Sequence, residues 1–120
     1  MTQNGQRFKN KVVIVTGAAN GIGRAIALRF GSEGAHVIVN DVDKANAEST
    51  TQAILTTGGS AIAGIADVSH KSQVDGLFDS ILERFGTVDV LVNNASLINT
   101  ERHFLEADEA WWDRILAVNL

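Results

Sequence analysis

A glycine-rich turn between an apolar run and a helical pattern constrains the fold of this chain most. The apolar run is residues 12–15 (Val-Val-Ile-Val), and residues 16–23 follow it as Thr-Gly-Ala-Ala-Asn-Gly-Ile-Gly. A strand that turns sharply into a helix needs one glycine for the tight turn, one where backbone approaches a pyrophosphate and one where the helix packs on the strand. Gly17, Gly21 and Gly23 stand in those places. The turn therefore predicts a site at which helix N–H groups and the helix dipole bind the phosphates of a dinucleotide.

An acidic residue at the end of the next apolar run favours the same interpretation. Asp41 follows Gly23 by eighteen residues (41 − 23) and comes just after the run at 37–39. An acidic residue about 20 positions after such a turn binds the ribose hydroxyls, and its charge repels a 2′-phosphate, so Asp41 favours NAD over NADP. The alternative is a solvated turn aspartate. A P-loop is excluded, because Arg24 and Ala25 occupy the positions that need Lys and then Ser or Thr.

Apolar runs of strand length alternate with helical periods along the chain, which is typical of βαβ units and a parallel sheet. Strands are expected at about residues 12–16, 36–40, 60–66 and 88–92. Right-handed crossovers then give the α/β class, as a partial Rossmann-type doubly wound parallel sheet with strand order 3-2-1-4. We expect a single nucleotide-binding domain over residues 1–120, with the cofactor along the carboxyl ends of the strands.

Helices are expected between these strands. Asp43 is the expected N-cap of the second helix and Ser69 that of the third, because both side chains can accept from a first-turn N–H group. The third helix ends at Gly86 and carries an apolar stripe that is expected to be core. The members of the stripe are Val74, Leu77, Phe78, Ile81, Leu82 and Phe85.

Three further motifs follow the turn in a fixed order. They are Asp67-Val68 after the third strand, Asn93-Asn94-Ala95 after the fourth, and Asn119 in the final helical segment. With residues 16–23, this series resembles the N-terminal half of a short-chain dehydrogenase/reductase. Ser96 departs from the family, which usually has Gly there. We interpret this small side chain as a tolerated variant that reshapes the floor under the nicotinamide ribose.

The resemblance implies a role for each matched residue. Asp67 would accept from the adenine amino group while the N–H of Val68 donates to the ring, although an aspartate here is also typical of a turn. Asn94 would bond the backbone across strands. Asn119, the one catalytic residue expected in this chain, would orient a water and a lysine in a proton relay, or else serve as a cap. The remaining cofactor-binding residues implied are Gly17, Asn20, Gly21, Ile22, Gly23, Asn93, Ala95 and Ser96.

The same resemblance implies an oxidoreductase that transfers hydride between NAD(H) and a small-molecule alcohol or carbonyl substrate. NADP is less favoured, because family members that use it often have a basic residue where this chain has Asn20. The family's chemistry also needs Ser, Tyr and Lys, yet the chain has no tyrosine. We therefore expect a segment that stops before the catalytic Tyr/Lys part and is inactive alone. The alternative is a shortened, non-catalytic nucleotide-binding or interaction protein.

Composition excludes several other classes. The net charge is −4 and Lys/Arg residues form no cluster, which disfavours nucleic acid or an anionic membrane as partner. His36, His70 and His103 lack ligand spacing and cysteine is absent, so no metal is expected. No apolar run approaches a membrane span or a signal peptide, and a cytoplasmic location is expected. Trp111 and Trp112, about 100° apart on a helix, cannot share one buried face. The family resemblance implies a homo-oligomer, a dimer or tetramer, in which one indole faces a partner subunit; the alternative is that one indole lies half-exposed on the surface.

Overall fold

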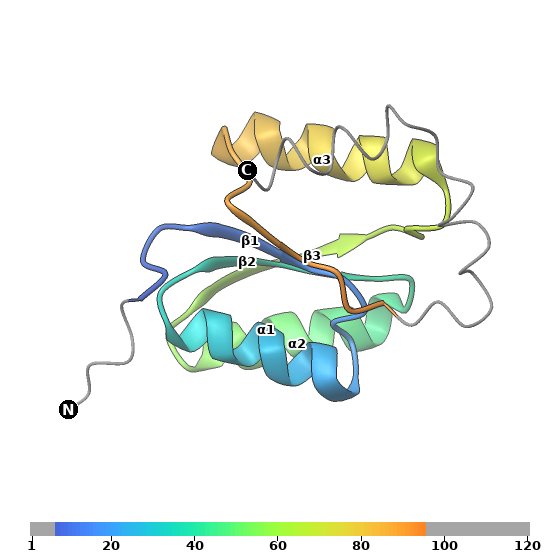
Figure 1. The fold of residues 1–120 in the computed structure, drawn as a ribbon. Coiled ribbons are helices and arrows are strands. Elements are labelled where there is room, and N and C mark those ends of the chain that lie inside the picture. Colours follow the sequence, from blue (N-terminus) through green and yellow to red (C-terminus); the bar gives the residue numbers. More distant parts are fainter. Residues whose placement is uncertain (1–6, 96–120) are drawn as a thin grey trace.

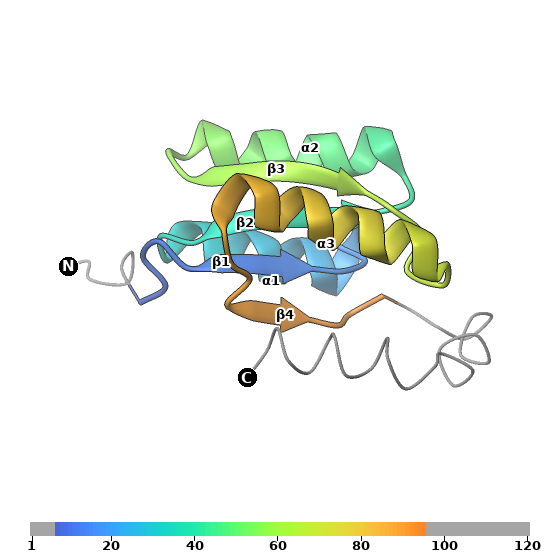
Figure 2. The ribbon, with the colours of Figure 1, turned by 90° about the horizontal axis from the view of Figure 1, so that it is seen from above.

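Four apolar runs form a parallel sheet with β1 and β2 as its inner strands. A computed structural model describes residues 7–95. The strands are β1 (Val12–Val15), β2 (His36–Asp41), β3 (Ser60–Ile65) and β4 (Val90–Val92). Their order is β3-β2-β1-β4, visible from above in Figure 2, and every adjacent pair is parallel. The order 3-2-1-4 predicted from the right-handed crossovers is confirmed.

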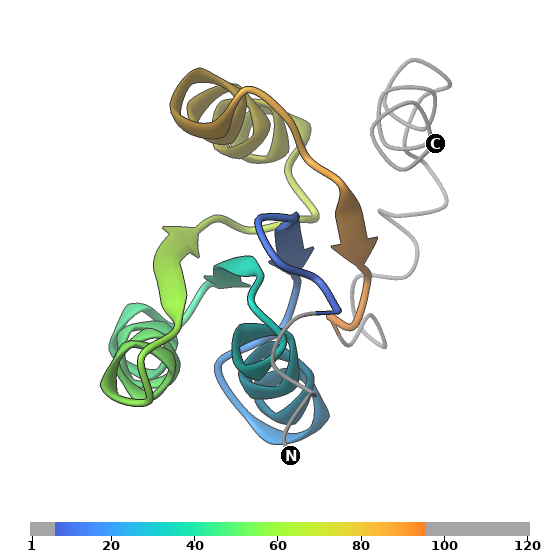
Figure 3. The ribbon, with the colours of Figure 1, turned by 90° about the vertical axis from the view of Figure 1, so that its left-hand side faces the viewer.

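Helices cover both faces of this sheet (Figures 1 and 3). The helices α1 (Gly21–Ser32) and α2 (Lys44–Thr56) lie on one face, and α3 (Lys71–Phe85) lies on the other. Because successive strand residues point to opposite faces, each strand contributes to two separate cores. The core under α1 and α2 includes Val13, Val15, Val37, Val39, Ala27 and Ile54. The core under α3 includes Val12, Ile14, Ile38, Val74, Phe78 and Ile81.

The start of α3 differs from the expectation. His70, not Ser69, is the N-cap residue, and its side chain makes no capping hydrogen bond. The Ser69 hydroxyl instead donates to Asp67 Oδ1 (2.7 Å), which also accepts from the Ser69 N–H group (2.9 Å). The prediction for Ser69 was wrong because this local aspartate turn uses its hydroxyl. Asp43, by contrast, caps α2 as predicted and accepts from the Asn46 N–H group at 3.1 Å.

One core prediction and one strand boundary on this side of the sheet also need correction. Leu82 is 37% exposed, because the apolar stripe is wider than the face of α3 that the sheet covers. Val88 is buried but precedes β4, which begins at Val90. Asp89, which lies between Val88 and β4, makes two hydrogen bonds to Val12 of β1. Its carboxylate accepts from the Val12 N–H group (2.8 Å), and its backbone N–H group donates to the Val12 carbonyl (2.9 Å).

A buried glutamate joins the end of α1 to the segment before β1. Glu33 is 1% exposed, and its Oε2 accepts from Arg7 (2.6 Å) and Arg29 (3.0 Å). The hydrogen bond from Arg7 holds the pKa of Glu33 below its ordinary value. The backbone carbonyl of Glu33 accepts from the Phe8 N–H group (2.9 Å), and the Phe8 ring packs edge-on against Phe30.

Glu33→Gln is expected to reduce the acid sensitivity of the fold. Since the folded pKa of Glu33 is lowered, its ionisation stabilises the protein at neutral pH, and this contribution is lost as the pH falls through the lowered pKa. The difference in unfolding free energy between wild type and variant should therefore shrink towards acid pH. Asp67, whose pKa is also lowered, is present in both proteins and cancels. Denaturant unfolding at several pH values checks this; a constant difference from about pH 7 to about pH 3 contradicts it.

Candidate functional site

The glycine-rich turn lies at the carboxyl end of β1, where its glycines have three different environments. Gly17 and Gly21 have left-handed backbone angles (φ 62° and 57°). A Cβ on Gly17 would lie 2.9 Å from Ala95 Cα, and one on Gly23 would overlap the Gly17 carbonyl and come within 2.5 Å of Asn94 Nδ2. A Cβ on Gly21 would meet nothing within 4 Å. The turn is thus closely packed at Gly17 and Gly23 and open at Gly21.

The first turn of α1 keeps N–H groups available beside this open backbone. Asn20 is the N-cap residue, with extended backbone (φ −142°, ψ 164°) and no side-chain capping hydrogen bond. The Arg24 N–H group makes the first helical bond, to the Asn20 carbonyl (3.2 Å). Ile22 is 74% exposed. An uncapped helix start with unpaired N–H groups and a positive dipole end suits an anion, and the open Gly21 provides room for its approach.

Asp41 ends β2 next to the turn, and its carboxylate connects two segments. Its Oδ2 accepts from the Ala19 N–H group at 3.2 Å, and its Oδ1 accepts from the Asp43 N–H group at 3.1 Å. Asp41 is half-buried. Each carboxylate oxygen can accept more than one hydrogen bond, so these contacts leave acceptor capacity for hydroxyl groups of a ligand.

The segment after β4 is fastened to the turn by Thr16, which sequence reasoning missed as a site residue. The Thr16 hydroxyl accepts from the N–H groups of Asn94 and Ala95, both at 2.9 Å. It also donates to Asn93 Oδ1 at 3.3 Å. Asn94 Nδ2 donates to the Gly17 carbonyl (3.3 Å), so Asn94 bonds backbone across strands as predicted. These contacts hold residues 93–95 against the turn.

Asp67 lies in the segment between β3 and α3, and its carboxylate is already hydrogen-bonded. Besides its contacts with Ser69, its Oδ2 lies 3.0 Å from His70 Nδ1. The Ser69 hydroxyl is the main cause that holds the pKa of Asp67 below its ordinary value. The Asp67 N–H group donates to Gln73 Oε1 (2.8 Å), and the half-buried Val68 packs against the core under α3. The turn role of Asp67 is therefore observed, and its adenine-binding role stays a prediction.

Asn40 is a second polar residue that the motifs did not reveal. It is 1% exposed, and its Nδ2 donates to the carbonyls of Gly64 (2.9 Å) and Ala66 (3.2 Å). The backbone carbonyl of Asn40 accepts from the Ala18 N–H group (2.9 Å). A buried amide at a strand end must find such partners, so Asn40 fixes the ends of β2 and β3 beside the turn.

Several predicted features lie outside the described residues: Ser96, His103, Trp111, Trp112 and Asn119. Within residues 7–95, no group of His, Cys, Asp and Glu is arranged to hold a metal ion. In the same part of the chain, no helix combines the length and apolar character that crossing a bilayer requires. His36 begins β2, where its Nδ1 lies 2.8 Å from the Ser60 hydroxyl and its ring stacks on Phe85.

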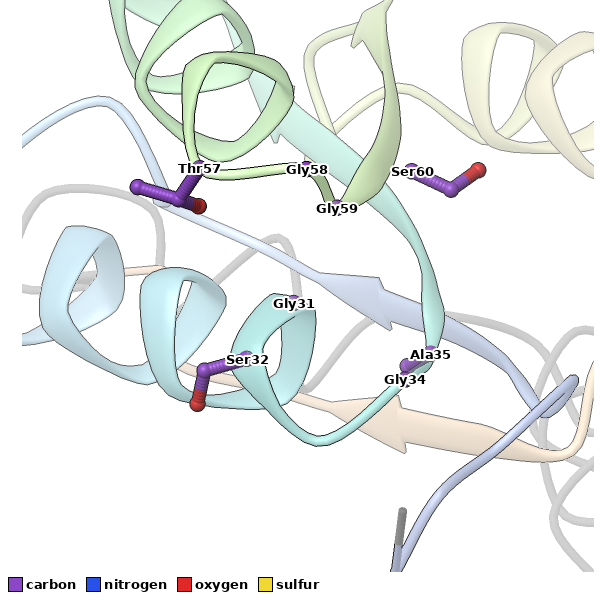
Figure 4. Close-up of a pocket in the computed structure, with 8 residues that line it drawn as sticks. All are labelled: Gly31, Ser32, Gly34, Ala35, Thr57, Gly58, Gly59 and Ser60. Atoms are coloured by element: carbon purple, nitrogen blue, oxygen red, sulfur yellow. The ribbon is translucent and has the colours of Figure 1, made fainter. Parts of the chain in front are cut away.

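A pocket of about 270 Å³ lies at the opposite end of the sheet, between the ends of α1 and α2 and the starts of β2 and β3. The side chains of Ser32, Thr57 and Ser60 point in different directions around it (Figure 4). Its lining has no charged side chain, so nothing converges on a ligand there, and we assign it no function. The lining residues are Gly31, Ser32, Gly34, Ala35, Thr57, Gly58, Gly59 and Ser60.

Comparisons with known proteins agree with this geometry. The family model for short chain dehydrogenases matches residues 11–120. The short chain dehydrogenase/reductase dpchG of Colletotrichum higginsianum is 40% identical over 118 residues, which cover 98% of this chain and 44% of that protein. Glucose 1-dehydrogenase 2 of Bacillus subtilis is 42% identical over 111 residues, which cover 92% of this chain and 43% of that protein.

A solved structure gives the same result. The apo form of glucose dehydrogenase from Caenorhabditis elegans matches with a TM-score of 0.74 and 34% identity, over 84% of this chain and 49% of that one. The chain belongs to the short-chain dehydrogenase/reductase family and corresponds to its N-terminal half. It spans less than half the length of the two curated relatives above. Members of this family use a nicotinamide cofactor, either NAD(H) or NADP(H).

Proposed function

We propose that the full-length protein is an NAD-dependent oxidoreductase that transfers hydride between NAD(H) and a small-molecule alcohol or carbonyl substrate. The observation that carries the proposal is the uncapped start of α1 beside the open backbone of Gly21, with the Asp41 carboxylate at the end of the adjacent strand. Such a helix start binds pyrophosphate, and such a carboxylate binds ribose hydroxyls. When bound, the nicotinamide ring supplies the hydride chemistry.

The described residues then divide the work of holding the cofactor. The backbone of the turn and the first turn of α1 bind the pyrophosphate, and the exposed Ile22 offers an apolar contact. Asp67 and Val68 bind adenine at the end of β3. The described residues assigned to the pyrophosphate and to the path of the nucleotide are Gly17, Asn20, Gly21, Gly23, Asn93 and Ala95; the proposal adds Ser96 beyond them.

Two residues support NAD rather than NADP in this proposal. The Asp41 carboxylate repels a 2′-phosphate, which adds close to two negative charges at neutral pH. Asn20 is uncharged and exposed where a basic side chain would otherwise attract that phosphate. The nearest basic residue, Arg24, lies one turn into α1 instead, and its Nη1 donates to the Thr50 hydroxyl on α2 at 2.8 Å.

Catalysis in the proposal needs residues beyond the described part of the chain. Asn119 is assigned to the proton relay by its match to the family motif. A tyrosine, with a lysine and a serine, acts as general acid/base on the substrate oxygen. We further propose a single nucleotide-binding domain over residues 1–120, a homo-oligomer and a cytoplasmic location, as the sequence patterns predict.

A turnover assay of the full-length protein tests the proposal. Two named relatives are glucose dehydrogenases, and a third, from Eggerthella lenta, is a 3beta-hydroxysteroid dehydrogenase. A panel of sugars and hydroxysteroids with NAD is therefore the first choice, with the appearance of reduced nicotinamide as readout. Turnover of any member supports the proposal. Tight NAD binding with no turnover of alcohols or carbonyls supports instead the non-catalytic alternative.

A further inference from the structure

Thr50, in the middle of α2, has a buried hydroxyl to which no motif assigns a role. Its side chain is 0% exposed. The Thr50 hydroxyl accepts from Arg24 Nη1 (2.8 Å) and donates to the carbonyl of Ala19 (3.3 Å). A guanidinium only donates and a carbonyl only accepts, so the hydroxyl oxygen accepts from Arg24 while its one proton is donated to Ala19. This hydroxyl therefore joins α2 to the first turn of α1 and to the glycine-rich turn.

Ala19 is held from two directions by side chains. Its N–H group donates to Asp41 Oδ2 (3.2 Å) and its carbonyl accepts from the Thr50 hydroxyl. The residue is 2% exposed, so water does not replace either bond at low cost. Thr50 thus acts on the same residue whose N–H group binds the Asp41 carboxylate.

We propose that Thr50 is a positioning residue for the adenosine and pyrophosphate half of the dinucleotide site, acting through Ala19 on the turn and on Asp41. The inference rests on the proposed function. Loss of the hydroxyl leaves the Ala19 carbonyl and one Arg24 donor without their buried partner, and the turn shifts to find others. The Asp41 carboxylate, which depends on the Ala19 N–H group, then loses its fixed orientation towards the ribose hydroxyls.

The neighbouring threonine provides a matched control. The Thr51 hydroxyl donates to the Ala47 carbonyl at 2.8 Å, so its hydrogen bond stays within α2 itself. Thr50→Val keeps the shape of the side chain and removes the hydroxyl, Thr50→Ser keeps the hydroxyl, and Thr51→Val removes a hydroxyl from the same helix. Comparing the three separates the contact with Ala19 from general effects on α2.

The experiment is calorimetric titration of the full-length wild type and these variants with NAD and with ADP-ribose, below their melting temperatures. We expect Thr50→Val to weaken binding of both ligands about tenfold, as for one buried acceptor left unpaired. Thr50→Ser and Thr51→Val should stay within about twofold of wild type. Because ADP-ribose lacks the nicotinamide, an equal loss for both ligands locates the effect in the adenosine and pyrophosphate half. If Thr50→Val does not fold, Thr50→Cys, with its weak S–H donor, should show about a threefold loss.

Other outcomes overturn the inference. Thr50→Val binding as tightly as wild type, even with a lower melting temperature, would show a purely structural role. Thr50→Ser as weak as Thr50→Val would show that packing, and not the hydroxyl, matters. A folded wild type that binds neither NAD nor ADP-ribose overturns the proposed function and this inference together. A wild type that binds both, with an unaffected Thr50→Val, overturns the inference alone.

Discussion

Gly23→Ala is expected to destabilise the full-length protein by about 3 kcal/mol, the upper range for overpacking a close contact. The new Cβ would overlap the Gly17 carbonyl and lie 2.5 Å from Asn94 Nδ2. The Gly17 carbonyl is backbone and Asn94 Nδ2 donates to it, so neither α1 nor the turn can shift without losing contacts. Chemical denaturation measures the loss, and any folded fraction should bind NAD more weakly.

Gly76→Ala is the matched control for this change. Gly76 lies within α3, and a Cβ there would meet nothing within 4 Å. Replacing glycine by alanine inside a helix lowers the entropy of the unfolded chain, so we expect a gain of about 0.5–1 kcal/mol. If Gly23→Ala and Gly76→Ala change the free energy of unfolding in the same direction, the result contradicts a close approach of α1 to the turn.

Asp41→Ala is expected to weaken NAD binding by about 10- to 100-fold, as for loss of a charge-assisted pair of hydrogen bonds to the ribose. NADP binding should change less or improve, because the variant no longer repels the 2′-phosphate. The dissociation constant for NADP divided by that for NAD, measured by titration of the full-length protein, therefore falls. That ratio distinguishes recognition of the ribose from a general loss of structure, which would weaken both cofactors alike.

Asp43→Asn controls for charge near the same site. It removes one negative charge two residues from Asp41, while asparagine still serves as an N-cap for α2. We expect the preference for NAD to persist in this variant. An equal loss of preference in Asp43→Asn and Asp41→Ala would mean that the local potential, and not the Asp41 side chain, selects the cofactor.

Local patterns predicted the strands, the helices and the glycine-rich turn, because apolar runs, helical periods and turn chemistry each act over a few residues. The handedness of βαβ crossovers then gave the strand order. The parallel order 3-2-1-4, the Asp43 cap and the cross-strand bond of Asn94 all follow from such rules. The Ser69 prediction failed where two local rules competed, since Asp67 used the hydroxyl that would otherwise cap α3.

Contacts between distant segments were out of reach of these rules. The bonds of Thr50 with Arg24 and Ala19 join residues 26 and 31 positions apart. Similarly, the sequence around Glu33 shows only a glutamate at a helix end, because its partner Arg7 lies 26 residues earlier. Only the packing of α1 against α2 and of the first segment against α1 makes these polar side chains buried.

The most direct test of the NAD site is a side-by-side calorimetric titration of the folded full-length protein with NAD and NADP. The proposed roles of the α1 N-terminus and Asp41 predict that NAD binds at least about tenfold more tightly than NADP. Tighter binding of NADP would contradict the role given to Asp41. Failure of a demonstrably folded protein to bind either cofactor would contradict the proposed site as a whole.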